Sequence, residues 1–167
     1  AALGNDGGAG IGGGPGMLVG AALALKGSGR IAVGVLGDGD TLMGIQAFWT
    51  AARYGIPLLA VVANNRSFFN DEVHQERVAR QRGRPVGNKW IGQAITGPDI
   101  DIAAIARAQG IAGIGPVHTA GELREAVAQG LKWVKQGRAV LVDARVAPGY
   151  AAAMTAGLTR EAGRRSE

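Results

Sequence analysis

Short apolar runs that alternate with helical segments are the feature that most constrains the fold of this chain. Residues 31–36, 58–63 and 139–142 are apolar and bounded by turn residues, as is typical of strands buried on both faces of a parallel sheet. Helical spacing of apolar residues, with Gly or Pro at the ends, predicts the helices. We expect helices at residues 17–26, 41–54, 71–82 and 100–109, and a further helix that begins at the capping box of residues 119–122. A short strand is expected at residues 111–114.

This alternation predicts an α/β fold, with three α/β/α layers and a mostly parallel sheet flanked by helices. The first sixteen residues are rich in Gly and lack periodicity, so we expect a loop there. Because an α/β domain that opens on a loop has no strand before its first helix, we also expect that the first strand of the domain is missing.

Length and composition indicate one globular domain. The chain has 167 residues, no Cys and two His, so disulfides are excluded and we expect no metal cluster of several His. We expect no membrane association and a cytoplasmic location, because the sequence has neither a long uncharged apolar stretch nor a signal peptide at its start. The expected domain covers residues 1–148, and residues 149–167 form a C-terminal arm or disordered tail.

The formal net charge of +5 is compatible with an anionic small ligand or, as a weaker alternative, with nucleic acid. Much of the excess lies at residues 77–89 and 160–165. Neither segment interleaves aromatic residues that would stack on bases. We therefore predict that the chain does not bind nucleic acid.

Polar residues follow two neighbouring strands of the predicted sheet. The first strand runs into Gly37-Asp38-Gly39-Asp40 and the second into Asn64-Asn65. Taken separately, the first motif is typical of a turn and the second of a strand end. One βαβ crossover joins the two strands, however, and places their carboxyl ends side by side. Hard oxygen donors suit Mg²⁺, and Gly residues with a helix N-terminus suit phosphate. The residues alone therefore predict a magnesium-diphosphate site.

The same two motifs resemble the C-terminal diphosphate-binding (PP) domain of thiamine diphosphate enzymes of the acetolactate synthase, benzoylformate decarboxylase and pyruvate decarboxylase group. That family has Gly-Asp-Gly, about two dozen residues, and Asn-Asn. Here Gly37-Asp38-Gly39 is followed by residues 40–63 and then by Asn64-Asn65. The resemblance runs from about residue 8 to residue 146.

The resemblance implies the site residues. Asp38 and Asn65 would be side-chain ligands of Mg²⁺, and the backbone oxygen of Ser67 would be a third ligand. The residues implied to line the diphosphate are Gly37, Gly39, Asp40, Phe68 and Phe69.

The glycine-rich opening also resembles the family, which has Gly residues and a final Gly-Ala at the spacing seen here in Gly12, Gly14, Gly16, Gly20 and Ala21. By this resemblance Ile11 is the apolar residue that wedges the cofactor into its bent form, and so it is a catalytic candidate. Ala9 would accept a hydrogen bond from the aminopyrimidine through its carbonyl, and Gly10, which lies between Ala9 and Ile11, would also contact the cofactor.

The implied activity is that of a lyase or transferase that uses thiamine diphosphate and Mg²⁺ to act on a C–C bond next to the carbonyl of a small 2-oxo acid or aldehyde. Activation needs a glutamate from a pyrimidine-binding (PYR) domain, on the same longer chain or on a separate subunit. We therefore expect this chain alone to be inactive and to work in a homo- or hetero-oligomer, at least a dimer.

Several residues carry alternative interpretations. Asp71 lies where some relatives place an acid that handles substrate protons, and it is a catalytic candidate, but it also reads as a solvated carboxylate at a helix start. His74 is expected to be exposed, and Trp90 either covers the site or packs on the core. A different class of function, a non-catalytic α/β binding module that has kept the fold, also remains open.

Overall fold

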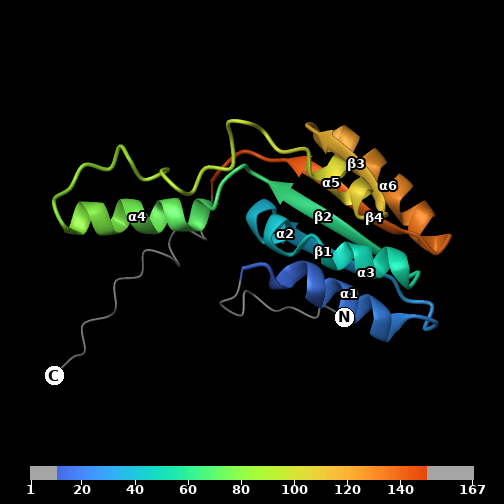
Figure 1. Ribbon diagram of the computed structural model, residues 1–167. Coiled ribbons are helices and arrows are strands. Elements are labelled where there is room, and N and C mark those ends of the chain that lie inside the picture. The colour runs from blue at the N-terminus through green and yellow to red at the C-terminus, as the bar shows by residue number, and fades with distance from the viewer. Residues whose placement is uncertain (1–10, 150–167) are drawn as a thin grey trace, which may run out of the picture.

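The computed structural model describes residues 11–149 and has ten helices and strands in this part of the chain. Four parallel strands form one sheet in the order β1-β2-β4-β3 (Figure 1). In chain order the elements are α1 (Gly13–Leu25), β1 (Ala32–Gly37), α2 (Asp38–Gly44), α3 (Ala47–Arg53), β2 (Leu58–Asn64), α4 (Phe69–Gln81), α5 (Ile102–Ala108), β3 (Ala112–Val117), α6 (Ala120–Lys135) and β4 (Ala139–Arg145).

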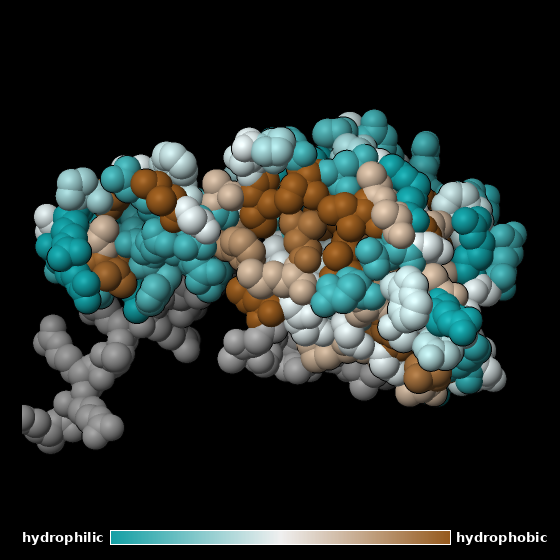
Figure 2. All heavy atoms as spheres, in the orientation of Figure 1, coloured by the Kyte–Doolittle hydropathy of each residue, from teal (hydrophilic) through white to brown (hydrophobic). Residues whose placement is uncertain are grey.

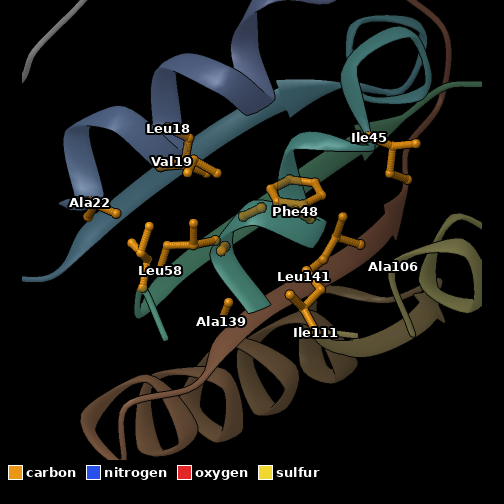
Figure 3. Close-up of a cluster of buried hydrophobic side chains, with 14 of the residues drawn as sticks. Leu18, Val19, Ala22, Ile45, Phe48, Leu58, Ala106, Ile111, Ala139 and Leu141 are labelled. Atoms are coloured by element: carbon orange, nitrogen blue, oxygen red, sulfur yellow. The ribbon is translucent and has the colours of Figure 1, made fainter. Parts of the chain in front are cut away.

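Helices cover both faces of this sheet, so the expected three-layer α/β/α fold is confirmed. On one face, α1, α3 and α5 pack on the strands around fully buried Phe48 (Figure 3). On the other face, α6 packs on β2, β3 and β4 around Leu59, Val140 and Val142. Because β2 and β4 lie in the middle of the sheet, their apolar side chains are buried from both sides.

The strand register brings the two polar motifs to the same edge of the sheet. Ala32 pairs with Leu58 and Gly37 pairs with Ala63 along the parallel strands β1 and β2. Asp38 therefore follows the end of β1 beside the end of β2. This is the carboxyl edge, where open parallel sheets gather their ligands.

Two predictions about the first helices were wrong in detail. Residues 13–16, predicted as loop, form the first turn of α1. The single helix expected at 41–54 is divided into α2 and α3 near Ile45, and α2 already begins at Asp38. The Gly37-Asp38-Gly39-Asp40 motif is therefore the start of a helix and not a separate tight turn.

The prediction that the first strand is buried on both faces was also wrong. Val33 is 55% exposed and Val35 is 75% exposed. The reason is that α1 covers one face of β1, where Leu18 lies against Gly34, whereas α6 lies over the other three strands. Figure 2 shows hydrophobic side chains gathered on the visible face of the body of the molecule.

The segment between β2 and α5 projects from the body as an arm that contains α4 (Figure 1). Within the described part of the chain, every residue of α4 keeps some exposure. Glu76 pairs with Arg80 and Lys89, and the surface of the arm is mostly hydrophilic (Figure 2). Polar and basic sequence without an apolar stripe thus gives a helix that packs little on the core.

The capping box predicted before α6 is confirmed. The Thr119 hydroxyl accepts a hydrogen bond from the Glu122 backbone N–H at 3.2 Å, and the Glu122 carboxylate accepts one from the Thr119 N–H at 3.1 Å. A further bond from the backbone N–H of His118 lowers the pKa of Glu122.

No helix within residues 11–149 is long and apolar enough to cross a membrane. The predicted C-terminal arm lies almost entirely outside the described residues, and the division at residue 148 stays a prediction.

Candidate functional site

Asp38 is the first residue of α2 and lies at the carboxyl end of β1, with only 3% of its surface exposed. Its carboxylate accepts hydrogen bonds from two backbone N–H groups, Gly39 at 2.9 Å and Ser67 at 3.2 Å. Burial raises the pKa of this carboxyl, and backbone hydrogen bonds, that of Gly39 foremost, partly offset the rise. The site thus holds an acidic oxygen at a place where burial penalises its negative charge.

The turn after β2 brings a second oxygen to the same place. The Asn65 side-chain oxygen accepts a hydrogen bond from the Ser67 N–H at 2.9 Å, and this is the N–H that also contacts Asp38. The turn needs Arg66 at φ 61°, a left-handed conformation that is uncommon for a residue other than Gly. The structure therefore brings Asp38 and Asn65 together around one backbone group, as the sequence predicted.

The donor atoms at this point suit a hard divalent cation. One buried carboxylate and one amide oxygen converge, and the carbonyl of Ser67 belongs to the same turn. Mg²⁺ takes oxygen ligands and often has few protein side chains, with water and phosphate oxygens completing the octahedron. No group of three or more His, Cys, Asp and Glu side chains able to hold a metal is present among residues 11–149, so a site of the transition-metal type is not indicated there.

The backbone of Ser67 is fixed from both sides. The Phe68 N–H donates to the Gln93 carbonyl at 2.9 Å, and the Ile95 N–H donates to the Arg66 carbonyl at 2.8 Å. The Ser67 hydroxyl donates to the Glu72 carboxylate. These contacts join the base of the projecting arm to the turn, and no pattern in the sequence identifies residues 93–95 as partners of the turn.

Gly39 is packed against an aromatic ring. A Cβ added to Gly39 would lie 2.6 Å from Cδ1 and 2.8 Å from Cζ of Phe68, well inside the distance of about 3.5–4.0 Å at which carbon atoms pack. A side chain at the second glycine of the motif would therefore force the Phe68 ring to move. Phe69, the neighbouring candidate, begins α4 and is partly buried.

The Asp40 side chain points to the start of α1. Its Oδ1 accepts hydrogen bonds from the backbone N–H of Gly12 at 2.7 Å and of Gly14 at 3.3 Å. A Cβ added to Gly14 would overlap Oδ2 of Asp40. This carboxylate thus satisfies free N–H groups at a helix N-terminus, and contact of Asp40 with a diphosphate would have to use its backbone.

The remaining candidates are spread around this edge. Ile11 is 54% exposed, which leaves its side chain available for a ligand. Ala9 and Gly10 lie outside the described residues. Asp71 is in the first turn of α4 and partly buried, and its catalytic role stays a prediction. His74 is exposed as expected.

Trp90 lies in the projecting arm and is not part of the buried core of the described residues, whereas a role in covering the site stays a prediction. Its side chain is 54% exposed and its indole N–H donates to the Gly87 carbonyl at 2.9 Å within the arm.

Sequence reasoning missed one buried group next to the site. Asp143 on β4 is fully buried, and its Oδ1 accepts a hydrogen bond from the Asn64 side-chain nitrogen at 2.8 Å. A signal was present, because Asp143 is an acidic residue inside the apolar strand sequence AVLVDAR.

The chain is thus an α/β domain with a parallel sheet, and its Gly-Asp-Gly helix start and Asn-Asn turn meet at the carboxyl edge of that sheet. The sequence model described as "Thiamine pyrophosphate enzyme, C-terminal TPP binding domain" matches residues 2–144. The chain belongs to this family, and the resemblance inferred from the motifs is confirmed.

Solved structures agree with this assignment. A thiamine diphosphate-dependent 4-hydroxybenzoylformate decarboxylase from Rhodococcus jostii is 26% identical, with a TM-score of 0.64, and the match covers 84% of this chain and 24% of that one. A benzoylformate decarboxylase from Polynucleobacter necessarius has the same fold, with 21% identity, a TM-score of 0.64, and coverage of 86% and 25%. The chain thus spans about a quarter of the length of these structures. No curated protein sequence matches it.

Proposed function

We propose that this chain is the thiamine diphosphate- and Mg²⁺-binding portion of a 2-oxo acid decarboxylase or carboligase. Family membership supports thiamine diphosphate as the cofactor. The observation that carries the metal site is the convergence of Asp38 and Asn65 on the Ser67 N–H, from the ends of two adjacent strands. The decarboxylase activity is supported by the 26% identity to the Rhodococcus enzyme.

Different residues of this chain would contact the metal, the diphosphate and the rings of the cofactor. Asp38, Asn65 and the carbonyl of Ser67 would hold Mg²⁺, which in turn neutralises and orients a diphosphate. Gly37, Gly39 and the N-terminus of α2 would face the phosphates, because backbone N–H groups and the helix dipole favour anions there. Ile11, which is exposed at the start of α1, would support the rings of the cofactor.

The bound cofactor would supply the carbanion chemistry that cleaves or forms C–C bonds next to a carbonyl, and the protein supplies binding and orientation. Under the proposal, this chain does not contain all of the groups that bind the substrate and transfer protons. A PYR domain would provide the activating glutamate, and the coverage of only about a quarter of each related structure supports such additional domains. Asp71, in the first turn of α4, would be the acid of this chain that handles substrate protons.

The alternative function is a module that has kept the fold without binding the cofactor. The buried Asp38 argues against it, because a carboxylate that only costs free energy of folding is readily replaced by a neutral residue. The intact pair of oxygens at the sheet edge therefore favours binding.

Isothermal titration calorimetry of the full chain with thiamine diphosphate, in Mg²⁺ and again in EDTA, tests the proposal. We expect binding in Mg²⁺ only, and its loss in Asp38→Asn. Asp101→Asn is the matched control, because it makes the same chemical change at the exposed N-cap of α5, where Asn caps as well as Asp. Binding that is equal in Asp38→Asn, or absent from the unsubstituted chain in Mg²⁺, would contradict the proposal.

A further inference from the structure

Asp143 is a buried acidic residue for which the proposed site has no direct use. It lies on β4 with 0% of its surface exposed. Its Oδ1 accepts the hydrogen bond from Asn64, whereas Oδ2 has no hydrogen-bond partner among residues 11–149. A buried acid with an unsatisfied oxygen lowers stability relative to an apolar residue of similar size. Packing of the sheet alone therefore does not account for Asp143.

The edge strand β3 is irregular where it passes Asp143. Strand β3 loses its regular register between Ile114 and Val117, beside Asp143. Gly115 lies in this irregular stretch at φ 124°, and a Cβ there would lie 3.1 Å from the Cβ of Asp143. The same Cβ would lie nearer still, at 2.6 Å, to the backbone oxygen of Asp143, so the edge strand approaches the main chain and Cβ of Asp143 closely at this point.

Two hydrogen bonds connect Asp143 to the turn that carries the candidate metal ligands. The Asn64 side chain donates to Asp143 through its nitrogen, and its oxygen accepts from the Arg66 N–H at 3.2 Å. Asp143 therefore fixes which way the Asn64 amide faces. The Arg66 bond in turn stabilises the left-handed residue of the turn, which sets Asn65 and Ser67 in place.

We infer that Asp143 is a positioning residue that orients Asn64 and so holds the 64–67 turn in the conformation that presents the Asn65 oxygen and the Ser67 carbonyl to a divalent cation. This inference rests on the proposed function. It also explains why the motif has two Asn residues in sequence. The first binds back to β4 and supports the turn, and the second faces the site.

The negative charge of Asp143 offers a competing explanation, since the charges of Asp101 and Asp38 both act on the Asp143 carboxyl and raise its pKa. A nearby charge would attract a cation without any effect on the turn. Arg145 opposes this role because its positive charge faces the same carboxylate. The two explanations differ in what an amide at position 143 would do.

Two substitutions separate them. Asp143→Asn removes the charge and keeps an oxygen that accepts from Asn64, whereas Asp143→Val removes both and suits a strand. Asp143→Ala is the second variant if Val does not fold. Val140→Ala is the matched control, because Val140 is equally buried on the same strand and packs against Leu59 and Val142, away from the turn.

The first readout is amide hydrogen exchange of residues 64–68 in the full chain without cofactor. We expect faster exchange in Asp143→Val and Asp143→Ala, and exchange close to that of the unsubstituted chain in Asp143→Asn and Val140→Ala. Because no cofactor is present, this measurement tests the inference independently of the proposed function. Unchanged exchange in both Asp143→Val and Asp143→Ala overturns the inference.

The second readout is the Mg²⁺ concentration that gives half-maximal binding of thiamine diphosphate. It should rise by about 10–100-fold in Asp143→Val, as is usual when a residue that supports metal ligands is lost, and by less than about tenfold in Asp143→Asn. Equal losses in both variants would assign the effect to charge and overturn the positioning role. Absence of binding by the unsubstituted chain would instead overturn the proposed function. The role of Asp143 in presenting oxygen ligands to a cation would then be overturned as well.

Discussion

Replacing Gly39 by Ala perturbs the candidate site through one defined contact. The added methyl group would enter the Phe68 ring, with two ring carbons at 2.6 Å and 2.8 Å and a third closer still. Normal packing needs about 3.5–4.0 Å, so the ring must move by roughly 1 Å or more. Overpacking of this kind costs about 1–3 kcal/mol. For a chain of this length the midpoint of thermal unfolding should fall by about 2–12 °C.

Gly37→Ala is the matched control two residues away. A Cβ on Gly37 meets no atom within 4 Å among the described residues, and its φ of −77° suits any residue. This variant should keep the unfolding midpoint or raise it slightly, because Ala restricts the unfolded chain.

Circular dichroism melts of both variants and of Gly39→Ala combined with Phe68→Ala test the contact. Removing the ring should relieve the clash, so the double variant should be more stable than the sum of the two single changes predicts, by about 0.5–3 kcal/mol. Equal melting of Gly39→Ala and Gly37→Ala, or strictly additive effects in the double variant, would refute the reasoning.

Three further predictions concern caps and buried charge. Asp40→Ala should lower the free energy of unfolding by about 1–2 kcal/mol in urea titrations, because α1 loses the carboxylate that accepts from Gly12 and Gly14; an unchanged value would contradict this. Thr119→Ala should cost about 1 kcal/mol by the same assay through loss of the capping box, whereas Thr119→Ser should cost less. Burial raises the pKa of Asp143 above its ordinary 3.8. Between about pH 4 and that raised pKa, the folded chain therefore keeps a proton that the unfolded chain has released. The free energy of unfolding should fall as the pH rises through this range. Urea midpoints measured from pH 4 to 8 should show this fall relative to Asp143→Asn, and a difference between the two proteins that is independent of pH would rule it out.

The site could be predicted from the sequence to the extent that it depends on strand ends. Parallel strands joined by one crossover place their carboxyl ends at one edge of the sheet. The residues just after the first two predicted strands were therefore expected to lie close together. Asp38 and Asn65 do so, because both accept a hydrogen bond from the Ser67 N–H. The capping box of α6 is local in the same way, since Thr119 and Glu122 satisfy each other within one turn.

Contacts between residues far apart in the sequence could not be predicted from strand ends and local patterns. The start of α1 at Gly13 depends on a carboxylate 26–28 residues away, and a loop was expected there because no local cap is present. The role of Asn64 depends on Asp143, 79 residues further on. The exposure of Val35 depends on which strands α6 covers, and an apolar pattern does not specify this.

The most direct test of the account is a crystal structure of the full chain with thiamine diphosphate and Mn²⁺ in place of Mg²⁺, because Mn²⁺ takes similar oxygen ligands and has an anomalous signal. The account predicts one anomalous peak about 2.0–2.3 Å from the side-chain oxygens of Asp38 and Asn65 and from the Ser67 carbonyl. A peak at another place, or a bound cofactor whose metal contacts neither Asp38 nor Asn65, would contradict it.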